Sequence, residues 1–291
     1  MPASPRPRFG IATAPQQVSY ADILRVWREA DAIPQIEHAW LFDHLMPIGG
    51  DPSGPILEGW TLLSALAAQT ARLRLGLLVT SNRFRPPAML AKIATTVDIV
   101  SGGRLEFGIG VGSRPGHPLA RREYAAYGLP FHDTADAVGS LAEACTVIRR
   151  LWTSDEPFDF DGSYLHLTGA FCNPKPVQRP YPPIMIGGAA SATLRVVAAH
   201  ADVWNIPSRD VADLIARSAL LDRFCAEIGR DPAEITRSVT QAVSYDQPGQ
   251  TRDAIAQAVE AGFRHVVLTL SAPYPEHIAR WVADEIIAKS A

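Results

Sequence analysis

The sequence predicts an α/β protein, and more specifically a (β/α)8 TIM barrel. Short apolar runs rich in β-branched residues alternate with longer stretches whose apolar residues recur at helical spacing, a pattern typical of βα units around a parallel sheet. Eight such pairs follow one another in strict order within 291 residues, which favours a closed barrel over two doubly wound halves. No linker-like stretch interrupts them, so we expect a single barrel domain over residues 1–291.

The expected elements can be placed along the chain. The strands are Arg8 to Ala14, His38 to Asp43, Leu73 to Thr80, Arg104 to Gly110, Pro183 to Gly187, Val203 to Pro207, Ser238 to Val243 and His265 to Leu270. The helices are Tyr20 to Ala32, Glu58 to Ala71, Ala88 to Val100, Ala135 to Trp152, Ser191 to His200, Val211 to Ile228, Thr251 to Ala261 and Pro275 to Ala288. Ser19 is a candidate N-cap for the first of these helices.

Composition and charge narrow the class of partner. Hydrophobic residues make up 47% of the chain and charged residues 20%, and the formal net charge is -3, so no broad basic surface is expected. Nucleic acid and anionic membranes are therefore poor candidate partners, and a small molecule is the better one. The N-terminus lacks the apolar core of a signal peptide and no run of about 18 apolar residues occurs, which predicts a cytoplasmic protein. The three cysteines, Cys145, Cys172 and Cys225, are expected to be reduced core thiols.

Two segments are longer than ordinary connections, namely Val111 to Thr134 after the fourth strand and Thr153 to Pro182 before the fifth. Such loops often cover a site and determine its substrate. The second is rich in proline and aromatic residues, with a hairpin-like turn expected at Asp159 to Gly162. Its aromatic side chains can form a lid or pack the barrel mouth: Phe158, Phe160, Tyr164 and Phe171, preceded by Trp152.

Polar and glycine residues gather where the expected strands end, and this rim carries the reacting groups in such barrels. His44 follows Asp43 at the end of the second strand. A histidine there can exchange a proton near neutral pH, with Asp43 either orienting it or contacting a cofactor. The alternative is a histidine that caps a neighbouring helix.

Two glycine-rich strand ends suggest a flat, phosphorylated ligand. Gly108, Gly110 and Gly112 can let a ring system approach the backbone, although tight barrel packing also explains them. They form no dinucleotide fingerprint, because Ser113 occupies a position that requires glycine. The segment 187–189 precedes a helix and can cradle a phosphate with backbone N–H groups, or simply make a tight turn.

Two other chemistries are disfavoured by the motifs. No HxH pair lies at a strand end, as a metal-dependent barrel normally requires, so no metal is expected. A Ser-His-Asp hydrolase is also disfavoured, because the sequence has no GxSxG motif.

Four stretches carry a resemblance to a known family. They are Glu58 to Ala67, Leu73 to Lys92, Asp98 to Gly112 and Pro182 to Gly188, which together span much of the expected barrel. They resemble the luciferase-like monooxygenase superfamily, and the third and fourth strands look most like its branch of F420-dependent oxidoreductases. The resemblance implies a cofactor, either coenzyme F420 or FMN, at the C-terminal ends of the strands.

Site residues follow from the same resemblance. His44 would lie near the reactive ring carbon as acid, base or alkoxide stabiliser, and Asp43 would contact the cofactor. A non-proline cis peptide is expected between Leu78 and Val79, forming a bulge behind the central ring. The remaining cofactor contacts implied are Ser81 at the ring, Val111 and Gly112 along the cofactor, and Gly187, Gly188 and Ala189 at its phosphate.

The resemblance implies hydride transfer between coenzyme F420 and a small organic substrate such as an alcohol, imine or activated alkene. An FMN-dependent monooxygenase, fed by a separate reductase, is the alternative. A barrel that binds a cofactor without turnover is a third reading, against which the presence of His44 argues. The apolar outer helices are compatible with a homodimer.

Overall fold

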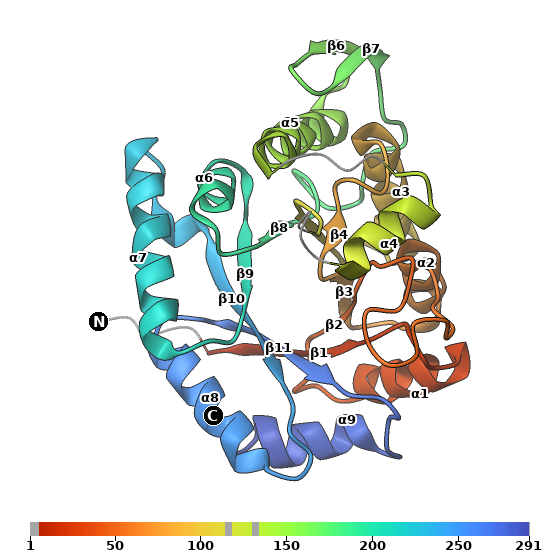
Figure 1. Ribbon diagram of the computed structural model, residues 1–291, viewed down its shortest axis with the longest axis vertical. Helices are drawn as coiled ribbons and strands as arrows, with labels where there is room; N and C mark the ends of the chain where they lie inside the picture. Colours follow the sequence, from red (N-terminus) through yellow and green to blue (C-terminus); the bar gives the residue numbers. More distant parts are fainter. Residues whose placement is uncertain (1–5, 114–117, 130–133, 291) are drawn as a thin grey trace.

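The computed structural model describes residues 6–113, 118–129 and 134–290. Within these residues, eight parallel strands close into a barrel surrounded by helices, which confirms the predicted fold class (Figure 1). The strands are β1 (Arg8–Thr13), β2 (His38–Leu41), β3 (Arg74–Leu77) with its continuation β4 (Thr80–Ser81), β5 (Leu105–Gly110), β8 (Ile184–Gly187), β9 (Val203–Pro207), β10 (Thr236–Ala242) and β11 (His265–Leu270). The barrel closes because β11 pairs with β1 and β3 pairs with β5.

The outer layer consists of helices that return the chain between neighbouring strands. They are α1 (Tyr20–Asp31), α2 (Gly59–Gln69), α3 (Pro87–Val100), α5 (Thr134–Thr153), α6 (Ser191–His200), α7 (Val211–Glu227), α8 (Pro248–Glu260) and α9 (Ile278–Trp281), the last continuing as the π-helical turn η2 (Val282–Ile287). A short 3₁₀ turn, η1 (Pro232–Glu234), precedes β10. Ser19 caps α1 as predicted, and Asp22 completes a capping box with it.

Two helix starts differ from the prediction. Helix α8 begins at Pro248 instead of Thr251, because proline has no N–H to leave unpaired and suits the first helical turn. The last helix begins at Ile278 instead of Pro275, after His277, whose φ of 57° is left-handed. Apart from such shifts at their ends, the predicted helices lie where they were expected.

The first long connection lies partly outside the described residues, which omit 114–117 and 130–133. Between these gaps it contains a helix that was not predicted, α4 (Pro118–Ala126). Gly128 follows this helix with a φ of +63°, a common way for a helix to end.

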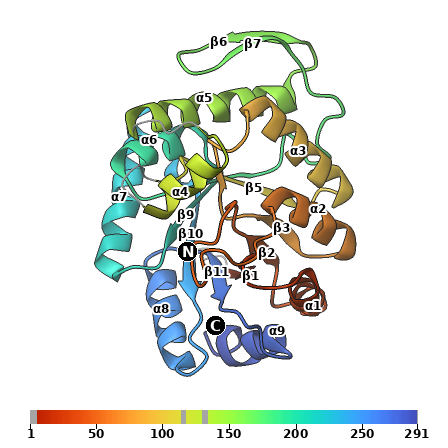
Figure 2. The same ribbon diagram turned by 45° about the vertical axis from the view of Figure 1, so that its right-hand side comes forward.

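The second long connection forms the hairpin β6 (Phe158–Asp161) and β7 (His166–Ala170). The turn expected at Asp159 to Gly162 is placed too early, because the chain turns between Gly162 and Leu165. Figures 1 and 2 both show the hairpin on the outer side of α5, away from the barrel. Phe158 is buried under the guanidinium of Arg150 on α5, so this residue packs against the helix and forms neither a lid nor a part of the barrel mouth.

The N-terminal end of the barrel is filled by a buried polar cluster. The His38 ring stacks on that of His265 at 3.9 Å between centroids, and His265 Nε2 lies 3.4 Å from the Glu106 carboxylate. Gly10 is required beside this pair, since a Cβ there would lie 1.8 Å from His38 Nδ1. In barrels of this kind the N-terminal end serves stability, which leaves the opposite end for function.

The predictions for the cysteines and for membrane-spanning helices can also be compared with the structure. Cys145, Cys172 and Cys225 are buried and unpaired by disulfides, as expected of core thiols. Burial raises the pKa of Cys145 to about 12, so this thiol stays protonated. Within the described residues, the helices lack the combination of length and hydropathy needed to cross a bilayer.

Candidate active site

A cavity of about 340 Å³ opens at the C-terminal ends of β2, β4, β5 and β8. It has the size of a pocket for a small molecule or cofactor. All ten residues predicted for the site line it: Asp43, His44, Leu78, Val79, Ser81, Val111, Gly112, Gly187, Gly188 and Ala189. The structure therefore brings together residues that are spread over about half of the sequence.

The floor of this cavity includes the break between β3 and β4. The peptide bond between Leu78 and Val79 is cis, which confirms the expectation from the family resemblance. Strand β5 passes close behind this break: a Cβ on Gly108 would lie 2.0 Å from the Leu77 carbonyl oxygen, and one on Gly110 would lie 2.8 Å from Val79 Cγ2. For these two glycines the alternative of tight barrel packing is therefore correct.

Gly112 has a different role from the other two glycines. Its φ of +82° is left-handed, and a Cβ there would lie 2.4 Å from the Ser81 hydroxyl oxygen. Only glycine fits both requirements. Gly112 lines the cavity together with Ser81 and Val111.

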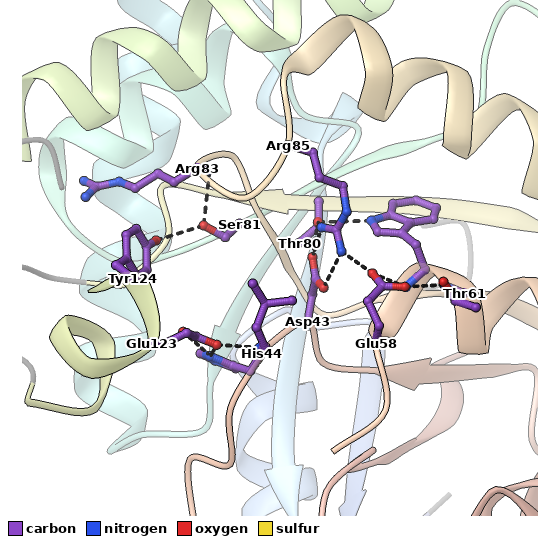
Figure 3. A network of polar contacts seen from close by, with 12 residues as sticks. Asp43, His44, Glu58, Thr61, Thr80, Ser81, Arg83, Arg85, Glu123 and Tyr124 are labelled. Atoms are coloured by element: carbon purple, nitrogen blue, oxygen red, sulfur yellow. Dashed lines mark hydrogen bonds and ion pairs between the residues drawn. The ribbon is translucent and has the colours of Figure 1, made fainter. Parts of the chain in front are cut away.

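His44 presents its ring to the cavity with one nitrogen already bonded. Its Nδ1 lies 3.1 and 3.2 Å from the two carboxylate oxygens of Glu123, on α4 (Figure 3). The ring makes edge contacts with Phe42 and Phe84. The side chain is 23% exposed, and within the described part of the chain no hydrogen bond is formed by its Nε2. This nitrogen is thus the one that can meet a ligand.

The Asp43 carboxylate bonds to Arg85 and Thr80 and does not orient His44, so the first of its two predicted roles is wrong, while contact with a cofactor stays a prediction. The Asp43 carboxylate is fully buried and accepts two hydrogen bonds from Arg85, at 2.6 Å and 3.1 Å, and a short one from the Thr80 hydroxyl (Figure 3). Arg85 also pairs with Glu58, which caps α2. Burial by itself would lower the pKa of Arg85, but its hydrogen bonds and ion pairs with these two carboxylates raise it.

Ser81 is held from the same helix that holds His44. Its hydroxyl lies 3.1 Å from the phenol oxygen of Tyr124, and it accepts a hydrogen bond from the backbone N–H of Arg83 at 3.2 Å. Burial raises the pKa of Tyr124, so the phenol remains protonated and uncharged. Residues 123 and 124 of α4 thereby fix two neighbouring parts of the cavity wall.

Gly187 and Gly188, at the end of β8, match the expected phosphate site only in part, because one of their backbone N–H groups is already bonded within the protein. The N–H of Gly188 donates to the carbonyl of Asn205 at 3.0 Å, and its φ is +136°, so this residue makes the tight turn of the alternative reading. The first turn of α6 remains a candidate for anion binding: it has no side-chain cap, and both Ala192 and Thr193 line the cavity.

Three functional candidates escaped the sequence analysis: Arg85, Glu123 and Tyr124. Arg85 lies within a stretch that carried the family resemblance, but its partner Asp43 is 42 residues away. The helix that bears the other two could have been found from Pro118 at its start and Gly128 after its end. Among the described residues, no group of three or more histidine, cysteine or acidic side chains could hold a metal ion.

Fold and cavity together define a class: a (β/α)8 barrel with a cavity of small-molecule size at the C-terminal ends of its strands. The particular family follows from comparison with known proteins. The chain belongs to the luciferase-like monooxygenase family, whose model matches residues 6–286.

Some curated relatives of this chain have a named activity. The phthiodiolone/phenolphthiodiolone dimycocerosates ketoreductase of Mycobacterium tuberculosis is 31% identical over 208 residues, which cover 70% of this chain and 51% of the relative. The match therefore spans about half the length of that ketoreductase.

Solved structures share the fold over nearly the whole chain. An F420-dependent secondary alcohol dehydrogenase, in complex with an F420-acetone adduct, superposes with a TM-score of 0.86 at 18% identity, covering 99% of this chain and 100% of that one. The FMN-bound oxygenating constituent of 3,6-diketocamphane monooxygenase from Pseudomonas putida gives 0.77 at 14% identity, covering 99% of each. The fold thus occurs with either cofactor.

Proposed function

We propose that this protein is an oxidoreductase that transfers a hydride between coenzyme F420 and a small organic substrate, with His44 as the acid or base. The observation that carries the proposal is the position of His44: the residue lines the cavity, its Nδ1 is bonded to Glu123, and among the described residues its Nε2 forms no hydrogen bond. General acid–base catalysis requires such a nitrogen within reach of the reacting group.

The lining of the cavity supports a tricyclic cofactor with a phosphate. The cis peptide at residues 78–79 lines the cavity, where the family resemblance expects a bulge behind the central ring. Ser81 and Val111 would hold the ring system, and the uncapped first turn of α6 would receive the phosphate. When bound, the cofactor supplies a carbon centre that accepts or donates a hydride.

The chain's own contribution is to move a proton and position the substrate. For an alcohol, His44 Nε2 would accept the hydroxyl proton while the carbinol carbon loses a hydride, which yields a carbonyl product. In the reverse direction the protonated ring would return that proton to the carbonyl oxygen. Phe42 and Phe84 flank the imidazole and would help exclude water from this transfer.

Three observations favour F420 over FMN. The third and fourth strands resemble the F420-dependent branch, and the F420-dependent dehydrogenase superposes better than the FMN-bound monooxygenase. In addition, the curated relatives include a ketoreductase, a name that fits reduction of a carbonyl better than insertion of oxygen. An FMN-dependent monooxygenase remains the second candidate, because the FMN-bound structure shares the fold.

Cofactor binding tests the proposal directly. The purified protein is incubated separately with F420 and FMN, passed through a gel-filtration column, and titrated by quenching of cofactor fluorescence. We expect F420 to be retained; retention of FMN without F420 would contradict the proposal. His44→Ala should then lower turnover by about 100-fold or more, the usual contribution of acid–base catalysis, with little change in cofactor binding. Undiminished turnover would remove the role of His44.

A further inference from the structure

Glu123 is a buried carboxylate with an unusual set of partners. Its side chain is 2% exposed, and it accepts hydrogen bonds from the backbone N–H groups of Leu45, at 2.5 Å, and Met46, at 3.3 Å, besides contacting His44 Nδ1. Among the described residues, no arginine or lysine pairs with it. A buried carboxylate is costly unless it is hydrogen-bonded or paired, so these contacts hold the charge in place.

The contact with Glu123 decides which nitrogen of His44 carries the proton. An ionised carboxylate only accepts hydrogen bonds, so the proton of a neutral His44 ring must lie on Nδ1. Nε2 then presents a lone pair to the cavity and is ready to accept a proton. Once it has done so, the ring is positively charged and lies 3.1 Å from the negative charge of Glu123.

The nearest carboxylate in the sequence does not perform this task. Asp43 is adjacent to His44, but its oxygens are occupied by Arg85 and Thr80. Glu123 reaches His44 from a helix that lies 79 residues further along the chain.

From this geometry we infer that Glu123 is the positioning residue of the site: it fixes the proton of neutral His44 on Nδ1 and its charge stabilises the protonated ring. The inference deepens the proposed function and rests on it for the effect on turnover. The effect on the histidine tautomer is independent of any cofactor.

The test compares Glu123→Ala and Glu123→Gln with Tyr127→Phe as a matched control. Tyr127 directly follows α4 and donates to the Leu45 carbonyl at 3.0 Å, so removing its hydroxyl takes away a contact between this segment and the loop after β2 without touching His44 or the cavity. The ring nitrogens of His44 are observed by NMR in histidine-labelled protein without cofactor, and the signal is assigned from its absence in His44→Ala.

The wild type and Tyr127→Phe should show the proton of the neutral ring on Nδ1, whereas Glu123→Ala should show it mainly on Nε2, the tautomer that free histidine prefers. Glu123→Gln keeps an acceptor but loses the charge, and its near-identical shape guards against failure of the alanine variant to fold. Both variants should lower kcat by about 10- to 100-fold, as loss of a supporting partner does elsewhere.

Two results would overturn the inference: an unchanged tautomer in Glu123→Ala, or wild-type kcat in Glu123→Gln. If the tautomer changes as expected but no turnover with F420 is found in any form of the protein, the proposed function fails while the positioning of His44 by Glu123 stands.

Discussion

The ion pair between Asp43 and Arg85 offers a quantitative test of how the site is built. The Asp43 carboxylate is fully buried and Arg85 is nearly so, and the two hydrogen bonds between them are well formed. In Arg85→Met the carboxylate keeps the Thr80 hydroxyl as its one side-chain partner among the residues that the structure describes. Breaking a buried pair by removing one charge costs about 3 to 5 kcal/mol, because the other charge stays buried without compensation.

For a chain of 291 residues this loss corresponds to a decrease in Tm of about 5 to 8 °C. The free energy of unfolding is measured by urea denaturation followed by circular dichroism. As a control, Lys289→Met removes an exposed pair with Glu285 and should cost less than about 0.5 kcal/mol.

The double variant Asp43→Asn with Arg85→Met provides the decisive comparison. Removing both charges abolishes the buried unpaired carboxylate, so the double variant should be more stable than Arg85→Met alone. If the double variant is no more stable than the single one, or if Arg85→Met costs less than about 1 kcal/mol, the buried pair is not what holds this side of the cavity.

Two further predictions concern a glycine and the dependence of stability on pH. An alanine in the left-handed region lowers the free energy of unfolding by about 1 to 2 kcal/mol. Gly112→Ala should lower it by more than this, because the added Cβ meets the Ser81 hydroxyl. Gly102 has a similar φ but lies in open space, so Gly102→Ala should cost only about 1 to 2 kcal/mol. If urea denaturation shows the same decrease in the free energy of unfolding for both variants, crowding at Gly112 is ruled out. Burial and two neighbouring arginines lower the pKa of His200 from 6.5 to about 4. Between pH 6.5 and 4, His200 is therefore protonated in the unfolded chain but stays neutral in the folded chain. The associated stability, on the order of 3 kcal/mol, is complete above pH 6.5 and is lost as the pH falls towards 4. His200→Gln should flatten this decline, and an unchanged acid slope would contradict the assignment.

Regular features of the sequence predicted the barrel well because each strand and helix carries its own local signal. Strand β11, for example, is a run of β-branched and leucine residues that the structure reproduces from His265 to Leu270. The Ser19 cap is equally local, since it needs only Asp22 three residues later. The ten site residues also lie at one cavity, because parallel strands bring their C-terminal ends to the same rim.

Partnerships across long sequence separations could not be predicted in this way. Asp43 and His44 are neighbours in the sequence, yet their side chains find partners in Arg85 and Glu123, 42 and 79 residues away. The Gly188 N–H is likewise taken by a strand that pairs only in the folded barrel. The homodimer, the cytoplasmic location and the single-domain organisation over residues 1–291 stay predictions.

A structure of the protein with F420 bound is the most direct test of the central claim. The account predicts the ring of the cofactor in the cavity beside Leu78 and Val79, with its reactive carbon facing His44 Nε2 and its phosphate at the first turn of α6. A cofactor bound elsewhere, or bound in the cavity with its reactive carbon turned away from His44, would contradict the account.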